Sequence, residues 1–269
     1  MLLDVLEVGE KEGTPLVVLP SMGLTHRPMT AVFEPVLRSV PACRRLYVGL
    51  PGTDGAPLTA PSSEAVLAAV VDTVTDRLGE SPFLVAGWSY GGYLAAALAR
   101  RLGNRVQGLF VVCAGPKISP EDRDLTGVQP STEEAGWLAA VPAELHEYFR
   151  LAVGHQSREV MARITAVLAA IGTRDQAFLE RLRAEAFALA DEEATFTYDG
   201  PVTFLCGRRD RVAGFAATIG SLGHYPDADL TLLAAAGHFL PLEEPDRFRA
   251  SLGAWLRRCG LLLGAPSRT

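Results

Sequence analysis

The sequence has little basic charge and no long apolar run. Lysine and arginine together number 25 against 31 acidic residues, which leaves a formal net charge of −6. Proteins that bind nucleic acid or an anionic membrane surface normally carry a basic excess, so neither partner is expected. No apolar run is long enough to cross a bilayer. Asp4, Glu7 and Glu10 lie where a secretory signal would be basic and then apolar, so no signal is expected.

Cysteines are also few, and they are too widely spaced to suggest a metal site. They are Cys43, Cys113, Cys206 and Cys259. Cys113 and Cys206 lie in apolar runs that are typical of buried strands, which favours reduced thiols with a structural role. Together with the missing signal, this predicts a cytoplasmic protein that holds no metal.

Apolar residues make up 48% of the chain and charged residues 21%, so a sizeable core can form. Continuous apolar runs, typical of strands buried on both faces, alternate with helical patterns. The runs lie at residues 16–19, 46–50, 83–86, 106–113, 202–205 and 230–233, with a weaker one at 2–8. Helices are expected at residues 30–40, from Ser62 or Ser63 to 78, and at 245–259. This alternation predicts an α/β protein with a mostly parallel sheet and helices on both faces.

The stretch from residue 117 to residue 197 shows no strand pattern. Apolar residues at helical spacing, such as Leu179, Leu182 and Leu189, predict helices instead. The expected helices span residues 133–140, 143–153, 157–171 and 175–189. A helical segment of this length is too long for a simple crossover between strands. We therefore expect a core built from residues 1–115 and 199–269, with residues 116–198 inserted as a helical cap.

The segment from Pro82 to Arg101 carries the most informative pattern. A short apolar run leads into Gly87-Trp88-Ser89-Tyr90-Gly91-Gly92, and an Ala- and Leu-rich helical stretch follows. Gly-x-Ser-x-Gly between a strand and a helix is typical of a nucleophile elbow, where a serine sits at the apex of a strained turn. The glycines allow strand and helix to approach closely. The pattern alone also fits a serine that caps a helix, so partners elsewhere in the chain must decide.

A serine nucleophile needs a base to take its proton and an acid to orient that base. Of the five histidines, only His238 directly follows a strand beyond a suitable acid, and Asp210 follows the strand that ends near residue 205. Three competing aspartates precede strands and would lie at the opposite edge of the sheet: Asp199, Asp227 and Asp229. Sites in parallel sheets form at the carboxyl ends of strands, so Ser89, Asp210 and His238 are predicted to meet there. A turn-forming aspartate and a surface histidine are the simpler alternatives.

The oxyanion of an acyl-transfer intermediate needs hydrogen-bond donors. The backbone N–H of Tyr90, directly after the serine, is one candidate. The second is the N–H of Met22, in the loop that follows the strand at residues 16–19.

Taken together, these motifs resemble the α/β-hydrolase superfamily, and most closely its small capped bacterial members of esterase type. The resemblance rests on residues 19–23, 50–55, 87–92, 207–210 and 237–238, with Glu244-Pro245. It implies a Ser89–His238–Asp210 triad, acyl-serine chemistry and no cofactor. Most relatives have His-Gly where this chain has Pro20-Ser21. The chain also begins close to its first central strand, so the antiparallel strands at the sheet edge are expected to be at least partly missing.

Several other side chains near these motifs are assigned structural roles. Trp88 is expected to pack beside the elbow. His26 and Arg27 either face the mouth of the active site or, as we favour, stabilise the oxyanion loop or meet solvent. The aromatic residues Trp137, Tyr148 and Phe149 either line an apolar pocket or, more commonly for helical spacing, belong to the core.

The favoured function is hydrolysis of an ester, thioester or lactone with a mainly apolar acyl group. The partner is thus a small molecule, and the sequence does not indicate an oligomeric state. Hydrolysis of a C–C bond in a ring-cleavage product would use the same triad. A ligand-binding protein on a hydrolase fold, with little turnover, is a further alternative that only the Pro20-Ser21 loop favours.

Overall fold

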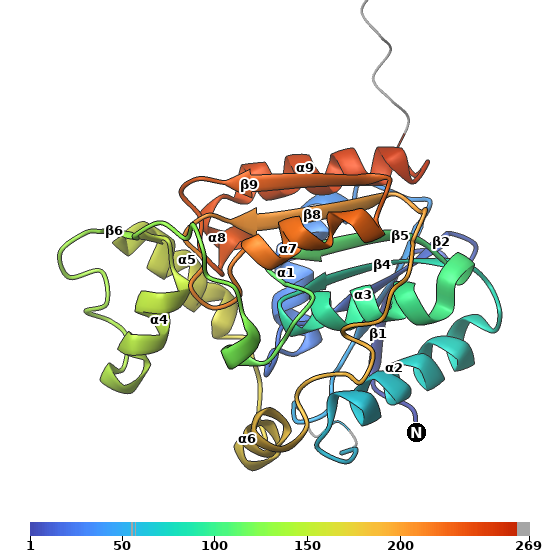
Figure 1. Cartoon of the computed structure of the whole chain (residues 1–269), viewed down its shortest axis with the longest axis horizontal. Helices are drawn as coiled ribbons and strands as arrows, with labels where there is room; N and C mark the ends of the chain where they lie inside the picture. The colour runs from blue at the N-terminus through green and yellow to red at the C-terminus, as the bar shows by residue number, and fades with distance from the viewer. Residues whose placement is uncertain (55, 57, 263–269) are drawn as a thin grey trace, which may run out of the picture.

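A seven-stranded sheet forms the centre of the molecule (Figure 1). The computed structural model describes residues 1–54, 56 and 58–262; Gly55 of the 50–55 motif and the end of the second core part lie outside them. The strands follow the order β1-β3-β2-β4-β5-β8-β9. They span Val5–Val8 (β1), Thr14–Leu19 (β2), Cys43–Val48 (β3), Phe83–Trp88 (β4), Val106–Val112 (β5), Val202–Gly207 (β8) and Ala228–Leu233 (β9). Only β1 is antiparallel to its neighbour, which confirms the predicted mostly parallel sheet.

Helices cover both faces of the sheet, because its strands carry apolar side chains on both sides. In β2, Val17 and Leu19 pack in the layer that includes α2 (Ser63–Leu78) and α3 (Tyr90–Leu102). Leu16 and Val18 point the other way, toward α1 (His26–Leu37) and α9 (Pro245–Arg258). Two short helices complete the core, α7 (Ala216–Ser221) and α8 (Leu240–Glu243). None of the described helices combines the length and apolar character needed to cross a membrane.

Helix α2 begins and ends where local signals place it. Its N-cap Ser62 accepts a hydrogen bond from Ala65 N at 3.2 Å, and the chain leaves the helix at Gly79 with φ 58°. Helix α1, by contrast, begins at His26, four residues before the predicted start. His26 and Arg27 therefore belong to its first turn.

Three helices lie between β5 and β8, beyond the carboxyl ends of the strands (Figure 1). They are α4 (His146–Ala152), α5 (Arg158–Leu168) and α6 (Gln176–Glu185). Single 3₁₀ turns occur at Gly103–Arg105, Pro120–Asp122, Ala143–Leu145 and Leu222–His224. This arrangement supports the proposed division into a core and a cap of residues 116–198.

The helix predicted at residues 133–140 is wrong, and so is the expectation that this region lacks strands. Thr132–Glu133 (β6) pairs in parallel with His155–Gln156 (β7). The N–H of Glu134 donates to Gln156 O at 2.8 Å, and Gly136 turns the chain with φ 72°. A partner distant in sequence thus takes the backbone groups that a helix would have used.

Helix α6 also ends before its predicted limit at residue 189. Ala186 O accepts a hydrogen bond from Ser63 N at 3.0 Å, and Phe187 O accepts one from Ser63 Oγ at 2.5 Å. These bonds draw the chain after α6 to the start of α2, where the two segments lie side by side (Figure 1).

Candidate active site

The turn between β4 and α3 has the geometry of a nucleophile elbow. Ser89 adopts φ 56° and ψ −122°, a conformation that costs energy in any residue with a Cβ atom. A Cβ atom on Gly87 would lie 2.2 Å from Gly91 O, and one on Gly91 would lie 2.2 Å from Leu19 O. Both positions therefore require glycine, as the motif predicts.

The structure brings Ser89, His238 and Asp210 into one line of hydrogen bonds. His238 Nε2 lies 2.8 Å from Ser89 Oγ, and His238 Nδ1 lies 2.9 Å from Asp210 Oδ2. Asp210 follows β8 and is fully buried, while His238 follows β9 and is 3% exposed. The other Asp210 oxygen accepts from the N–H groups of Val212 at 2.8 Å and Ala213 at 2.9 Å. Both oxygens of the Asp210 carboxyl group are thus held by hydrogen bonds, Oδ1 by the two backbone N–H groups and Oδ2 by the imidazole.

The two residues predicted to donate to the oxyanion lie next to the hydrogen-bonded Ser89 and His238. Met22 and Tyr90 both line the cavity onto which Ser89 and His238 open. Tyr90 is the first residue of α3, where backbone N–H groups have no acceptor within the helix. The loop that holds Met22 is pressed against the elbow, since a Cβ atom on Gly91 would lie only 2.6 Å from Pro20 O. With Pro20-Ser21 in place of His-Gly, the backbone of the loop at Pro20 thus still lies against the elbow helix at Gly91.

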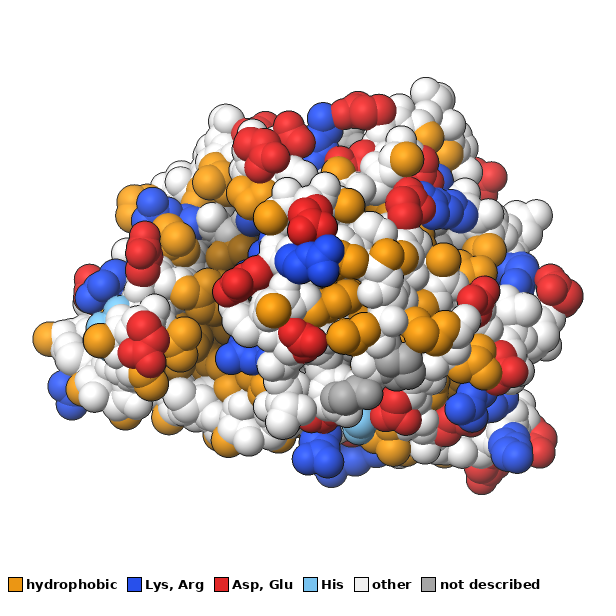
Figure 2. Space-filling model, turned by 90° about the horizontal axis from the view of Figure 1, so that it is seen from below, with side chains coloured by type: hydrophobic (Ala, Val, Ile, Leu, Met, Phe, Trp, Pro, Cys, Tyr) orange, Lys and Arg blue, Asp and Glu red, His pale blue; other side chains and the backbone are white. Residues whose placement is uncertain are grey.

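The cavity at Ser89 has a volume of about 470 Å³, and we call it the Ser89 cavity. Much of its wall is apolar, and its charged side chains are Arg123, Arg183 and Arg211. The remaining lining residues are Ser21, Met22, Tyr90, Ile118, Pro120, Leu125, Tyr148, Leu151, Phe187, Val212 and His238. On the lower face of the molecule, hydrophobic side chains gather in a hollow between the lobe with α4 and α5 and the rest of the chain (Figure 2). A cavity of this size accommodates a small-molecule substrate.

Glu243 is a buried carboxyl group beside the site, and no role is predicted for it from the sequence. Its Oε1 accepts from Gly237 N at 2.9 Å, and its Oε2 accepts from Gly154 N at 2.8 Å and His155 N at 2.9 Å. It thereby joins the loop of His238 to β7. Burial raises the pKa of Glu243 to about 7, although the three N–H donors partly offset this effect. Two adjacent glutamates follow His238 in the sequence, and nothing local indicates which one is buried.

The structure also decides the roles of the aromatic side chains near the site. Trp88 is 1% exposed and donates from Nε1 to His238 O at 2.9 Å, which confirms that it packs beside the elbow. Trp137 and Phe149 are buried in the core at 3% exposure each. Tyr148 instead lines the Ser89 cavity, with 45% of its side chain exposed.

The Cys113 thiol is buried against the acid and base of this site. One atom each of Cys113, Asp210 and His238 falls within 4.8 Å of the others. Burial holds the pKa of Cys113 well above its usual range, so the group is a neutral thiol. Its sulfur lies 3.5 Å from Gly237 O, so it packs against the loop that leads to His238.

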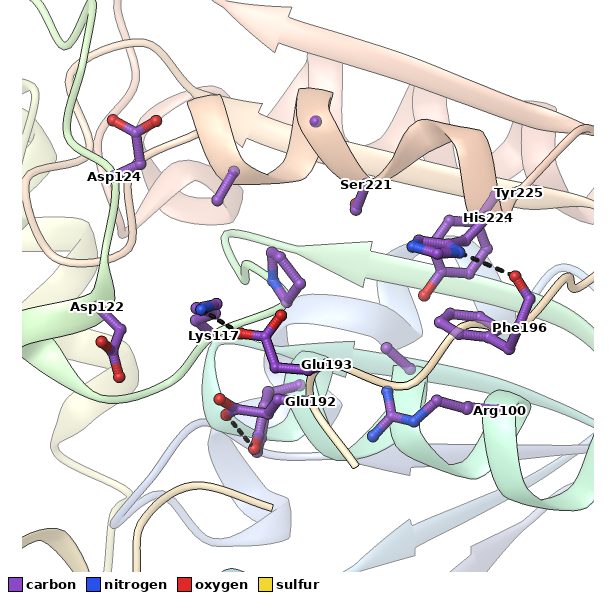
Figure 3. A pocket seen from close by; sticks show the side chains of 15 residues that line it. Arg100, Lys117, Asp122, Asp124, Glu192, Glu193, Phe196, Ser221, His224 and Tyr225 are labelled. Carbon is purple, nitrogen blue, oxygen red and sulfur yellow. Dashed lines mark hydrogen bonds and ion pairs between the residues drawn. The ribbon is translucent and has the colours of Figure 1, made fainter. Parts of the chain in front are cut away.

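A second cavity of about 400 Å³ lies along α3 and α7, and we call it the Lys117 cavity (Figure 3). One pair of its charged side chains is joined, since Lys117 forms an ion pair with Glu193. His224 Nδ1 lies 2.8 Å from Phe196 O. Among the described residues that line it, no serine is hydrogen-bonded to an imidazole. The arrangement offers no counterpart of the Ser89–His238 pair.

Comparison with known proteins adds one family and several relatives. A family model described as a thioesterase domain matches residues 29–248. The chain is 28% identical over 244 residues to a pimeloyl-(acyl-carrier protein) methyl ester esterase of Aromatoleum aromaticum, covering 86% of this chain and 93% of the relative. It is 23% identical over 248 residues to the biotin biosynthesis bifunctional protein BioHC of Cellvibrio japonicus. That match covers 86% of this chain but only 45% of the bifunctional protein.

Among solved structures, an alpha/beta superfamily hydrolase from Oenococcus oeni PSU-1 is similar over nearly the whole chain. The TM-score is 0.85 at 23% sequence identity, with 97% of this chain and 98% of the other covered. The likeness confirms the α/β-hydrolase fold that the motifs predicted.

Proposed function

The chain belongs to the thioesterase-domain family, and we propose that it hydrolyses a carboxylic ester, thioester or lactone through an acyl-serine intermediate. The observation that carries this proposal is the contact between Ser89 Oγ and His238 Nε2 at 2.8 Å, at the wall of a cavity large enough for a small molecule. The relative from Aromatoleum aromaticum is named as a methyl ester esterase, which supports an oxygen ester as one substrate type.

In the first step, Ser89 Oγ attacks the carbonyl carbon of the substrate while its proton passes to His238 Nε2. Asp210, hydrogen-bonded to Nδ1 at 2.9 Å, holds the imidazole in place and stabilises its positive charge. The N–H groups of Met22 and Tyr90 donate to the oxyanion of the tetrahedral intermediate. As this intermediate collapses, His238 returns the proton to the leaving oxygen or sulfur, and the acyl group stays on Ser89.

In the second step, His238 takes a proton from a water molecule, which attacks the acyl carbonyl. The second tetrahedral intermediate collapses to the free acid, and the proton returns to Ser89 Oγ. Residues 116–198 act as a cap that limits the entry of solvent and selects the substrate.

A fluorophosphonate probe tests this proposal, because it labels only an activated serine. We expect labelling of the wild-type protein and none of Ser89→Ala. A panel of nitrophenyl esters of rising acyl length then measures turnover. If the folded wild type takes up no probe, the protein is a ligand-binding member of the fold. If His238→Ala leaves ester turnover unchanged, the assignment of the base is wrong.

A further inference from the structure

The charged side chains that line the Ser89 cavity all have the same sign. Arg123, Arg183 and Arg211 line it, and no aspartate or glutamate does so among the described lining residues. The chain as a whole carries a net charge of −6. A positive cavity in an acidic protein therefore results from where the tertiary structure places three arginines, each from a different segment.

None of these three arginines forms an ion pair with a carboxylate in the described part of the chain. Arg123 donates to Ile118 O at 2.6 Å and 3.0 Å and to Val212 O at 2.7 Å. Arg183 Nε lies 2.9 Å from the sulfur of Met22. Carbonyl and thioether groups accept hydrogen bonds without cancelling the positive charge. Burial lowers the pKa of Arg123, the negative charge of Asp210 partly offsets this effect, and the neighbouring charge of Arg183 acts to lower the pKa further.

Several arginines elsewhere in the protein are paired with acids. Arg45 meets Glu34 at 3.1 Å, and Arg100 meets Asp191 at 2.7 Å. On α6 itself, Arg181 pairs with Glu185 at 3.0 Å, whereas Arg183 on the same helix reaches the cavity. The Ser89 cavity is thus lined by three guanidinium groups that have no carboxylate partner among the described residues, whereas the neighbouring Arg181 has one.

We infer that the substrate carries an anionic group, a carboxylate or a phosphate, which Arg183 and Arg211 bind while an apolar portion fills the rest of the Ser89 cavity. The guanidinium fork matches both anions, and apolar walls strengthen the attraction. Arg123, fixed by its bonds to two carbonyl groups, adds positive potential. This inference rests on the proposed ester hydrolysis. It adds an anionic group to a substrate whose acyl part was expected to be mainly apolar.

Matched pairs of substrates test the inference and separate two sources of the charge. Mono-4-nitrophenyl glutarate and 4-nitrophenyl pentanoate differ by a carboxylate on the acyl side. S-butyryl-4′-phosphopantetheine and S-butyryl-pantetheine differ by one phosphate on the leaving group. We expect kcat/KM to be at least about 10-fold higher for the anionic member of one pair, the gain expected from a charge-assisted hydrogen bond. The pair that responds identifies the part of the substrate that bears the anion.

Substitutions of the two exposed arginines, Arg183 and Arg211, test the same inference by changing the protein instead of the substrate. Arg183→Gln and Arg211→Gln are expected to lower kcat/KM for the anionic substrate about 10- to 100-fold, mainly through KM. Turnover of the neutral partner falls by a smaller factor, so the ratio of kcat/KM between the two substrates drops, and Arg183→Lys retains part of the preference. Arg181→Gln is the control on the same helix, since its side chain pairs with Glu185, and it changes neither substrate's kinetics.

The outcomes distinguish this inference from the proposed function. If the wild type hydrolyses neutral esters through Ser89 and neither pair favours the anion, the inference is overturned and the hydrolase assignment stands. If nothing is hydrolysed, binding to folded Ser89→Ala by calorimetry decides, with monomethyl glutarate against dimethyl glutarate. Selective binding of the monoanion that Arg183→Gln removes supports the inference although hydrolysis fails, and equal or absent binding overturns it.

Discussion

Two cavities of this protein, the Ser89 cavity and the Lys117 cavity, are similar in size but differ in what their side chains can do. The Ser89 cavity measures about 470 Å³ and the Lys117 cavity about 400 Å³. Each is lined by a serine and a histidine. Ser89 meets the imidazole of His238, whereas Ser221 donates to Thr218 O within its own helix. Cavity volume therefore does not identify the site, and the direction in which each polar group points does.

The histidines differ in the same way. His238 is buried and bonded to Asp210, which orients it toward the serine. His224 is bonded to a backbone carbonyl and stacks on the ring of Phe196 with centroids 4.7 Å apart. A catalytic histidine needs an acid bonded to one ring nitrogen and a nucleophile bonded to the other. Of these two cavities, the Ser89 cavity provides both. Four matched pairs of substitutions test this contrast, each with one member at the Ser89 site or in the structure that supports it and one at the Lys117 cavity.

The largest effect is expected from removing the serine hydroxyl in each cavity. Ser89→Ala loses the nucleophile, so ester turnover falls by about 10⁴-fold or more. Ser221→Ala removes a hydroxyl that bonds only to its own helix and leaves turnover unchanged. Steady-state rates with a nitrophenyl ester measure both. If Ser221→Ala lost activity instead, the assignment of the chemistry to the Ser89 cavity would be wrong.

The next largest effect concerns how tightly the chain packs around one glycine at each site, and it is measured as a change in the free energy of unfolding. Gly91→Ala places a Cβ atom 2.2 Å from Leu19 O, so the free energy of unfolding falls by more than about 3 kcal/mol. Gly220, in α7 beside the Lys117 cavity, has nothing within 4 Å of its Cβ position. Gly220→Ala is expected to stabilise the helix by about 0.5 to 1 kcal/mol. Urea denaturation measures both, and equal stabilities would show that the elbow tolerates a side chain.

Glu243 gives the third contrast, through the pH dependence of stability. The folded protein keeps a proton on Glu243 up to a pKa of about 7, while the unfolded chain loses it near the ordinary value of 4.5. Its contribution to stability is therefore full below pH 4.5 and is lost as the pH rises to 7, by about 3 kcal/mol.

Glu243→Gln removes this titration, so its free energy of unfolding changes less than that of the wild type between pH 4.5 and 7. Glu193→Gln, at the Lys117 cavity, is the control and keeps the wild-type slope. Denaturant titrations at several pH values give the slopes. Parallel curves for wild type and Glu243→Gln would contradict the raised pKa.

The smallest effect concerns the shape of the Ser89 cavity. Tyr148 lines it, so Tyr148→Ala makes room for one or two further methylene groups of the substrate. Each buried methylene is worth about 0.8 kcal/mol, or about 4-fold in kcat/KM for longer esters. Phe196→Ala at the Lys117 cavity leaves the preferred chain length unchanged. An unchanged optimum in Tyr148→Ala would place the acyl chain elsewhere.

Features that depend on short stretches of chain were predictable from the sequence. Strands such as β2 are buried on both faces and are therefore continuous apolar runs. The elbow needs small residues at fixed spacing around Ser89, so its pattern is local too. The order of strands and the rule that sites form at their carboxyl ends then selected Asp210 and His238 among many polar residues. The sequence by itself thus determined the sheet and the three residues that meet in the candidate site.

Features that depend on contacts between distant segments required the tertiary structure. Pairing of β6 with β7 replaced the helix predicted at residues 133–140, because the hydrogen bonds to a distant strand outweighed local helical spacing. The three-way bonding of Glu243 joins residues separated by 88 and 89 positions. Arg123, Arg183 and Arg211 come together from three segments of the chain, so no local pattern marks them as a group. The positive charge along the wall of the Ser89 cavity was decided by the fold alone, since it depends on which side chains the tertiary structure brings to that wall.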